Sequence, residues 1–326
     1  MRQLTVRAES WPIAGSFTIS RGSKTKADVV LVEVRDEAHS GRGECVPYAH
    51  YGETIAGTIA AIEQLRPRIE AGLDRAALQS ALSAGAARNA VDCALWDLEA
   101  KGAGCPVWQL AKLAPPRAVT TAYTLSLGPV ESMAEAARAN ADRPLLKLKL
   151  SGPGDLDRVR AVHENAPQAR LIVDANEAWT PEIFADLAPQ LSRLGVELIE
   201  QPLPAANDRA LADLARPVLV CADESCHDVA SLPALRGKYD AINVKLDKTG
   251  GLTEALRLAA AAKAAGLAVM VGCMVATSLS MAPALLLAQE ARWVDLDGPL
   301  LLAQDREPGL VYRGNLVQPA SPFLWG

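Results

Sequence analysis

The segment Leu145–Leu150 reads LLKLKL, an apolar strand that carries two lysines. Side chains i and i+2 of a strand share a face, so Lys147 and Lys149 point one way and the leucines point the other way. Two adjacent ammonium groups lower each other's proton affinity and are rarely buried without anionic partners. Alone, the pattern is typical of a half-exposed strand with solvated lysines. A lysine that can give up its proton near neutrality is a base, and the rest of the chain has to decide between these two interpretations.

Length and composition narrow the protein class. The chain has 326 residues, enough for two domains or for a barrel with an accessory domain. Half of the residues are hydrophobic and few are aromatic, which permits a large core covered by helices. The net charge of -5 argues against a nucleic acid or an anionic membrane as the main partner. We therefore expect a small-molecule partner.

The cysteines and the apolar segments indicate the compartment. Six cysteines are scattered without a C-x-x-C pair, and the start MRQLTVRAES has no apolar signal core. These features predict a cytoplasmic protein with free thiols. The uncharged run 264–289 has the length of a membrane span, but Gly272 and Pro283 interrupt it. A buried strand followed by a buried helix is predicted there instead.

Residues 1–115 are predicted to form an α+β domain. Alternating apolar segments indicate an antiparallel meander, with a polar loop at 14–27. Thr54 is placed to cap the first helix. A regular helical repeat spans 86–101, and its Asp92, Trp96 and Asp97 are expected to be structural, because a Trp at helical spacing usually belongs to a core. The predicted strands are 2–12, 29–35 and 41–47.

From about residue 118 the chain alternates short apolar strands with longer Ala- and Leu-rich helices. This is the pattern of β–α units, and eight of them form a barrel. We assign the barrel to residues 116–299 and expect the tail, 300–326, to pack on the first domain. The eight predicted strands are 120–127, 145–150, 171–176, 197–202, 218–224, 241–247, 268–274 and 293–297.

Carboxylates lie near the ends of three consecutive predicted barrel strands. Active sites of such barrels lie at the C-terminal ends of the strands, so Asp174, Glu200 and Asp223 should converge at one side of the mouth. A single acid there would be typical of a helix cap or a loop ion pair. Three in register repel one another and call for a cation, and oxygen ligands without His or Cys favour Mg²⁺.

Lysines are expected on both sides of that metal. Strands two and six lie on opposite sides of an eight-stranded barrel, so Lys149 and Lys245 should face each other. Two bases that flank one carbon can remove a proton from one face and return it to the other, which inverts the centre. Lys245 alone would be equally typical of an ion pair inside the barrel.

The motifs around these residues resemble the enolase superfamily, in the muconate lactonizing enzyme subgroup. The resemblance covers nearly the whole chain, through ALWDLEAKG, the K-x-K strand, VDANEAW, IEQPLP, ADES and NVKLDKTGG in that order. It implies an α/β fold, an enolase-type modified TIM barrel, (β/α)7β, with an N-terminal capping domain completed by the C-terminal tail. It also implies one Mg²⁺ per subunit on Asp174, Glu200 and Asp223, with Lys149 and Lys245 as the acid/base pair.

The end of the last strand narrows the choice among the reactions of this subgroup. The subgroup contains cycloisomerases, o-succinylbenzoate synthases, N-acylamino acid racemases and dipeptide epimerases, so the fold leaves the reaction open. Asp295-Leu296-Asp297 resembles the D-x-D signature of dipeptide epimerases, whose two carboxylates hold the ammonium group of the substrate. The period of a strand would put both acids on one face. A solvated strand end, or a link to a barrel lysine, is the structural alternative.

The substrate is less well defined. Arg21 resembles the arginine that pairs with the side-chain carboxylate of a substrate Glu, although one loop arginine is equally typical of a surface charge. The resemblance implies Mg-dependent 1,1-proton transfer at the α-carbon of the C-terminal residue of a dipeptide, L-Ala-D/L-Glu from murein. Epimerisation of non-acidic dipeptides, another reaction of the subgroup and dipeptide binding without turnover remain alternatives.

Further side chains receive supporting roles. Lys147 is expected to lower the proton affinity of Lys149 and to contact the substrate carboxylate. The four histidines have no metal-ligand spacing and are interpreted as surface or packing residues. We also expect a homo-oligomer. Thr124, Cys273 and Met274 are expected to shape the pocket, and Asn176 and Glu224 to support it from behind.

Overall fold

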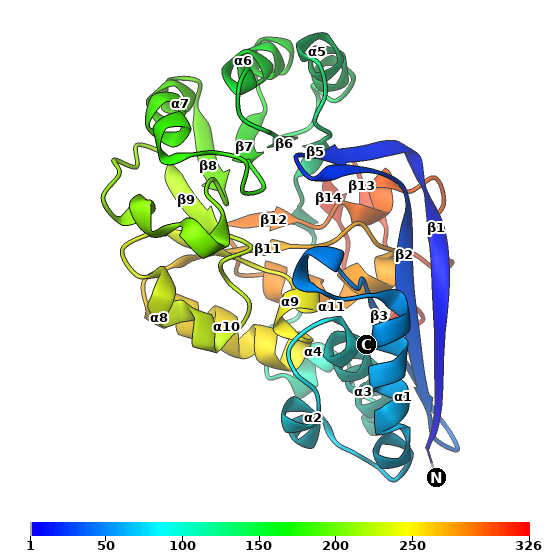
Figure 1. Ribbon diagram of the computed structural model, residues 1–326. Coiled ribbons are helices and arrows are strands. Elements are labelled where there is room, and N and C mark those ends of the chain that lie inside the picture. Colours follow the sequence, from blue (N-terminus) through cyan, green and yellow to red (C-terminus); the bar gives the residue numbers. More distant parts are fainter. Residues whose placement is uncertain (1) are drawn as a thin grey trace.

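Eight parallel strands roll into a nearly closed barrel in the computed structural model, which describes residues 2–326 (Figure 1). Each strand pairs with the next one in sequence, and Ala122 N, just before the first strand, donates to Val294 O of the last at 2.7 Å. The predicted α/β barrel is confirmed. Its strands are β5 (Tyr123–Leu125), β6 (Leu145–Lys149), β7 (Arg170–Asp174), β8 (Val196–Glu200), β9 (Leu219–Ala222), β10 (Ala241–Val244), β11 (Ala268–Gly272) and β12 (Trp293–Asp295).

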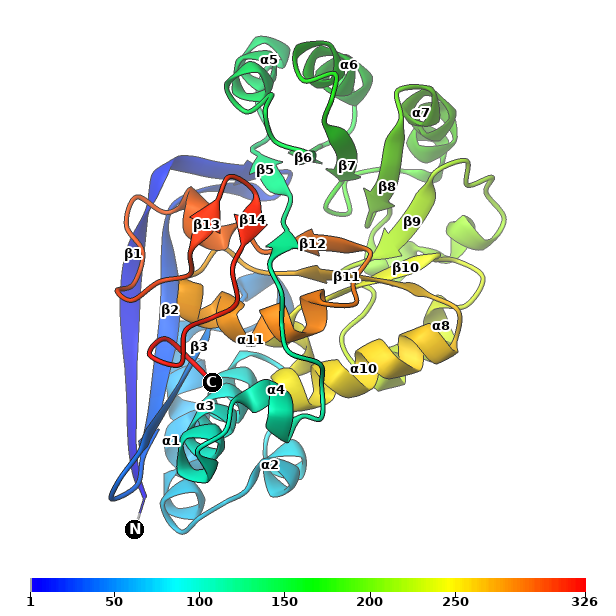
Figure 2. The same ribbon diagram turned by 180° about the vertical axis from the view of Figure 1, so that it is seen from behind.

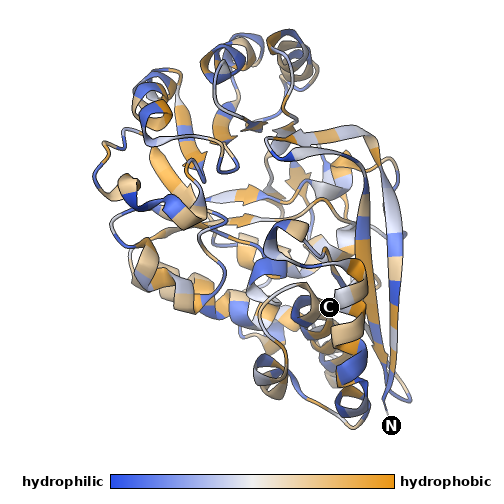
Figure 3. Ribbon diagram, viewed as in Figure 1, coloured by the Kyte–Doolittle hydropathy of each residue, from blue (hydrophilic) through white to orange (hydrophobic). Residues whose placement is uncertain are grey.

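Helices cover the outside of the barrel. Because both faces of these strands are buried, the strands are apolar along most of their length, and Figure 3 colours β8 and β9 as hydrophobic. After β8 the covering element is reduced to two short 3-10 turns, Ala205–Asn207 and Arg209–Ala212. The helices are α5 (Val130–Ala139), α6 (Asp155–Asn165), α7 (Pro181–Arg193), α8 (Leu232–Leu235), α9 (Leu246–Thr249), α10 (Leu252–Ala264) and α11 (Ser278–Ala288).

The N-terminal residues form the predicted meander and a helical layer. Thr54 caps the first helix as expected, because its side chain accepts from Gly57 N. A Cβ on Gly41 or Gly43 would lie 2.1 Å from a carbonyl oxygen of the third helix, so these glycines let that helix pack closely on the sheet. The elements are β1 (Gln3–Ile19), β2 (Gly22–Arg35), β3 (Ser40–Cys45), α1 (Ile55–Glu70), α2 (Arg75–Ala81), α3 (Ala86–Ala103) and α4 (Val107–Leu110).

The expected polar loop at 14–27 is wrong. β1 and β2 continue through it and meet at a tight turn, Ser20-Arg21, with an irregularity between Pro12 and Phe17. Side chains at this end are mostly exposed on both faces, so the alternation that marks a half-buried strand is lost. The hairpin end reaches over the barrel mouth, where Leu127 N donates to Thr18 O at 3.0 Å (Figure 1).

One barrel segment also differs from prediction. The expected strand 120–127 is split into β4 (Val119–Thr120) and β5, because β4 pairs with the C-terminal tail instead of the barrel. The tail strands β13 (Tyr312–Arg313) and β14 (Leu316–Val317) complete this small sheet (Figure 2). In the apolar run 264–289, strand β11 and helix α11 appear as predicted. No helix among the described residues is long and apolar enough to cross a membrane.

Side chains of α3 join the cap to the barrel and the tail, as expected for structural residues. Asp92 accepts from Thr253 N at 2.9 Å and Thr253 Oγ1 at 2.6 Å, and burial raises the pKa of Asp92 to about 6. Asp97 accepts from Gly326 N at 2.8 Å. The division of the chain at residues 115 and 299 stays a prediction, with which these contacts agree.

One buried ion pair connects all three parts. Glu44 of β3 is 1% exposed and accepts from Thr277 N and Thr277 Oγ1, which cap α11, at 3.0 and 2.7 Å. Arg306 of the tail donates to the same carboxylate at 2.5 and 2.9 Å and to Glu9 of β1 at 2.5 Å. Burial raises the pKa of Glu44, although Arg306 opposes the shift. Arg306 therefore neutralises a carboxylate that water cannot reach.

Arg306→Met is expected to lower the free energy of unfolding by about 3–5 kcal/mol, because it leaves a buried carboxylate without its cation. Arg7→Met is the control. Arg7 also pairs with Glu9, at 2.9 Å, but its side chain is 52% exposed, so we expect a loss below about 1 kcal/mol. Urea unfolding of both variants measures the difference. Small and equal losses would contradict this role of Arg306.

Candidate active site

The inward-facing side chains of the barrel change from apolar to charged along the strands. Leu145, Ile172, Leu198 and Trp293 belong to the apolar layer at the closed end. Two residues later, on the same face, the strands carry the charged and polar side chains of the site. Lys147 and Lys149 are only 1% and 6% exposed, so the alternative of a solvated lysine face is wrong. The inward residues of the second layer include Lys147, Asp174, Glu200, Asn243 and Asp295.

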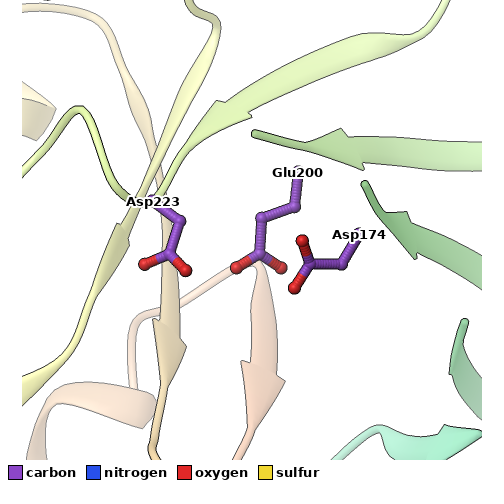
Figure 4. A group of neighbouring side chains, drawn as sticks. All are labelled: Asp174, Glu200 and Asp223. Carbon is purple, nitrogen blue, oxygen red and sulfur yellow. The ribbon is translucent and has the colours of Figure 1, made fainter. Parts of the chain in front are cut away.

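Asp174, Glu200 and Asp223 form a buried carboxylate cluster. One oxygen of each residue lies within 4.8 Å of the others, and the three side chains point toward one another from neighbouring strand ends (Figure 4). All three are at most 1% exposed. Their oxygens provide the hard ligands that Mg²⁺ prefers.

Lys147 connects this cluster to the last strand. Its Nζ lies 2.6 Å from Glu200, 2.7 Å from Asp295 and 3.3 Å from Asp174. Although burial opposes it, the three carboxylates raise the pKa of Lys147 well above its usual value, and Asp295 contributes most. Burial and the neighbouring Asp174 raise the pKa of Glu200 to about 7. Lys147 is therefore a fixed positive charge within the cluster.

Lys149 and Lys245 flank the cluster from its two ends. Lys149 Nζ donates to Asp174 Oδ2 at 2.6 Å, and Lys245 Nζ donates to Asp223 Oδ2 at 2.6 Å. Against the effect of burial, Lys149 and Lys147 lower the pKa of Asp174 to about 2. Asp223 raises the pKa of Lys245 well above its usual value. The expected arrangement of one lysine on each side of the carboxylates is present.

The structure adds residues that the sequence analysis missed. Lys248 Nζ donates to Asp223 Oδ1 at 2.6 Å, and Gln201 Oε1 accepts from Asp223 N at 2.8 Å. Asn243 Nδ2 donates to Glu200 Oε1 at 2.7 Å. These contacts hold two carboxylates in place. Lys248 stands in the quoted motif NVKLDKTGG, but the strand predicted to 247 ends at Val244, and a short helix turns Lys248 inward.

A cavity of about 920 Å³ lies between the β1–β2 hairpin and the barrel mouth. Both Lys149 and Lys245 line it, together with all the predicted pocket residues and with Asn176 and Glu224, whereas Lys147, expected to contact the substrate, lies behind the cavity wall. Aromatic residues of the N-terminal part also line the cavity. The sequence analysis did not predict them as pocket residues, since nothing in the local pattern around them indicates a pocket. The predicted lining residues are Arg21, Thr124, Asn176, Glu224, Cys273, Met274, Asp295 and Asp297, and the unpredicted ones include Phe17, Tyr48, His50 and Tyr51.

Asp295 and Asp297 are brought together by a different geometry from the one expected. β12 ends at Asp295, and Asp297 is the residue before a 3-10 turn, Gly298–Leu301. Thr124 joins the two acids, because its N donates to Asp297 Oδ2 at 2.6 Å and its Oγ1 to Asp295 Oδ1 at 3.4 Å. Burial and the charge of Asp295 raise the pKa of Asp297 to about 7. Asp295 also makes the link to a barrel lysine that was the structural alternative, since Lys147 lies 2.7 Å from it, and a cation beside Asp297 would favour the ionised form of that acid.

Arg21 stands at the hairpin turn and reaches the barrel loops. Its guanidinium donates to Glu224 Oε1 at 2.7 Å, to Asn176 O at 2.9 Å, to Tyr48 Oη at 3.2 Å and to Glu177 Oε2 at 3.3 Å. Burial, with a contribution from Asp223, raises the pKa of Glu224 to about 7. Arg21 therefore attaches the hairpin to the loops after β7 and β9.

Two characterised relatives match nearly the whole chain. An L-Ala-D/L-Glu epimerase from Escherichia coli is 46% identical and covers 96% of this chain and 98% of its own. An N-acetyl-D-glutamate racemase from Pseudoalteromonas is 43% identical over 91% of this chain and 95% of its own.

Solved structures agree in fold. An enolase family member from Agrobacterium tumefaciens with homology to dipeptide epimerases, solved with bound sodium and L-Ala-L-Glu, is 54% identical, with a TM-score of 0.98 over 100% of both chains. A dipeptide epimerase from Enterococcus faecalis complexed with Mg and L-Leu-L-Tyr is 31% identical, with a TM-score of 0.90 over 98% of this chain and 96% of its own.

Family models match both parts of the chain. The mandelate racemase / muconate lactonizing enzyme N-terminal domain matches residues 1–111, and the enolase C-terminal domain-like model matches residues 130–318. The chain therefore belongs to the mandelate racemase / muconate lactonizing enzyme family of the enolase superfamily.

Proposed function

We propose that this protein is a dipeptide epimerase that inverts the α-carbon of the C-terminal residue of a dipeptide by 1,1-proton transfer, with L-Ala-D/L-Glu as its substrate. The observation that carries the proposal is the pair Lys149 and Lys245 on the two flanks of a buried carboxylate cluster. The E. coli epimerase, 46% identical, supports the substrate assignment. We further infer a cytoplasmic homo-oligomer that acts on peptides released from murein.

The cluster fits one Mg²⁺, which Asp174, Glu200 and Asp223 would hold. Three buried carboxylates are an all-oxygen donor set, and no His or Cys belongs to it. Bound there, Mg²⁺ would stabilise the negative charge that the substrate carboxylate gains when its α-proton is removed. Lys147, charged and beside Glu200, adds a second positive charge on the same side.

The two flanking lysines perform the proton transfer. A lysine must be neutral to accept the α-proton and protonated to return one, so at any moment one of the pair is neutral and the other charged. Each lysine donates to a cluster carboxylate at 2.6 Å, which holds its Nζ in position.

The substrate ammonium group is assigned to Asp295 and Asp297. Both line the cavity, and Thr124 orients their carboxylates. A racemase of N-acetylated glutamate, the activity named for the Pseudoalteromonas relative, needs no such anionic pair because its substrate has no ammonium group. The pair therefore favours a dipeptide over an N-acylated amino acid, while Cys273 and Met274 line the pocket beside it.

A mass-spectrometric screen of dipeptides in D₂O with Mg²⁺ tests the proposal. L-Ala-L-Glu and L-Ala-D-Glu should interconvert and gain one deuterium at the α-carbon. Lys149→Ala and Lys245→Ala should each lower epimerisation by at least about 10²–10⁴-fold, because each removes the acid/base group of one face. Both variants should still bind L-Ala-L-Glu. Absence of exchange with every dipeptide, or an active Lys149→Ala variant, would refute the mechanism.

Removal of divalent metal should abolish exchange, and Mg²⁺ should restore it. Because Mg²⁺ would bind the folded cluster, a concentration of 100 times its Kd should stabilise the fold by about 2.7 kcal/mol. Thermal unfolding measures this shift. The Asp174→Asn variant should lose most of the stabilisation by Mg²⁺. The matched control Asp157→Asn, on the exposed part of α6, should keep this stabilisation.

Asp297→Asn should discriminate between dipeptides and N-acylated substrates. The amide oxygen can still accept from Thr124 N, but the negative charge is lost, so KM for L-Ala-L-Glu should rise about tenfold or more. Exchange of N-acetyl-L-glutamate should not decrease. Steady-state kinetics with both substrates measures this difference, and equal losses would indicate that the pair does not bind an ammonium group.

A further inference from the structure

Gln201, the residue after Glu200, adopts a backbone conformation that is rare outside glycine. Its φ is 34°, in the left-handed region, and its side chain is fully buried. Such a conformation persists only where the surrounding contacts hold it, and it is found most often at functional sites. The contacts of the Gln201 side chain therefore indicate what the conformation serves.

The amide oxygen of Gln201 holds the loop after β9. It accepts from Asp223 N at 2.8 Å and from Ser225 N at 3.1 Å. Because an amide oxygen accepts and an amide nitrogen only donates, these two N–H groups determine which way the amide is turned. Asp223 and Glu224 both lie in the segment that these two bonds hold. Gln201 therefore positions the two acids through their backbone.

The amide nitrogen of Gln201 points to a second buried polar cluster. Its Nε2 lies 2.9 Å from Leu203 O, 2.9 Å from Ser225 Oγ and 3.0 Å from Tyr239 Oη. Both hydroxyl groups donate in turn to Asp208 Oδ2 at 2.8 Å, so their oxygens can accept from Gln201. Tyr239 is 3% exposed and does not line the substrate cavity. A chain of hydrogen bonds thus runs from Asp208 to the loop after β9.

Asp208 comes from the irregular segment that stands in place of a longer helix after β8. It lies between the 3-10 turns Ala205–Asn207 and Arg209–Ala212 and is 5% exposed. An Asp before a helical turn commonly caps it, but within residues 2–326 the Asp208 carboxylate makes no bond of this kind. It accepts instead from the cluster hydroxyls and from Lys238, whose charge compensates its own. Asp208 is therefore oriented toward the chain that ends at Asp223.

We propose that Asp208, Tyr239 and Gln201 are positioning residues that fix the backbone of Asp223, and that they thereby set the affinity of the carboxylate cluster for Mg²⁺. This inference rests on the metal site of the proposed function. Lys245 Nζ donates to Asp223 Oδ2 at 2.6 Å, so a Mg²⁺ ion must compete with an ammonium group for this carboxylate. A ligand that is already held in place loses less freedom on binding, and contacts behind a metal ligand influence metal affinity.

Calorimetric titration of Mg²⁺ without dipeptide tests this inference in the wild type and in Tyr239→Phe, Gln201→Met and Arg216→Met. Tyr239→Phe retains the ring and removes only the hydroxyl, and its Kd for Mg²⁺ should rise about tenfold. Gln201→Met breaks the chain completely, and its Kd should rise by up to about 100-fold. Arg216 is the control, because its Nη1 donates at 2.8 Å to Leu211 O and Gly237 O and joins the same two segments without taking part in the chain. Arg216→Met should not change the Kd.

Exchange of L-Ala-L-Glu at saturating Mg²⁺ gives the second readout. Tyr239→Phe should approach the wild-type kcat there, because the hydroxyl acts on the metal ligand and not on the substrate. The inference would be overturned by an unchanged Kd or a kcat that stays low in Tyr239→Phe, by an equal rise of the Kd in Arg216→Met, or by a wild type that binds no Mg²⁺. A wild type that binds Mg²⁺ but exchanges no dipeptide would refute the proposed function and leave the inference standing.

Discussion

The ion pair between Lys147 and the carboxylates of Glu200 and Asp295 is the contact on which the site depends. Removal of a charge from water costs several kcal/mol unless an opposite charge replaces the hydration. Eight charged residues of the cluster region satisfy this condition through one another, since each of the four lysines lies against an acid and each of the four acids against a lysine. The barrel can therefore bury charges that no member of the set could carry alone.

This requirement explains why the residues come from every part of the barrel. Lys147 and Lys149 of β6 need the acids that end three other strands, Asp174 of β7, Glu200 of β8 and Asp295 of β12, and only a closed sheet brings these strand ends together. Lys248 completes the set from a short helix after β10. A buried strand carrying two lysines is thus stable only in the assembled barrel, where its charges have partners.

The repeating parts of the molecule could be predicted from the sequence, and the parts without a repeat could not. The period of strands and helices indicated the barrel, and the acids at successive strand ends indicated the metal cluster, because both follow from regular geometry. The continuation of β1 and β2 through residues 14–27 was missed, since exposed side chains on both faces erase the pattern. Tyr48 and Lys248 were missed because only tertiary contacts place them in the site. The resemblance placed Asp297 in the cavity correctly. The strand geometry expected for it was wrong, because β12 ends two residues earlier.

The barrel and the hairpin differ in how rigidly each holds its side chains, and this difference separates their roles. The charged layer lies inside a closed sheet, where ion pairs and hydrogen bonds hold its side chains. It tolerates few substitutions, because each one leaves another buried charge unpaired. The hairpin, in contrast, is attached at its tip through Arg21 and a few loop contacts, and Phe17 and Lys24 on it line the cavity. Replacement of a hairpin side chain leaves no buried charge behind, apart from Arg21. Substitutions that alter the substrate therefore destabilise the fold least when they lie on the hairpin. The charged layer that transfers the proton can stay the same while the substrate residue that is inverted differs.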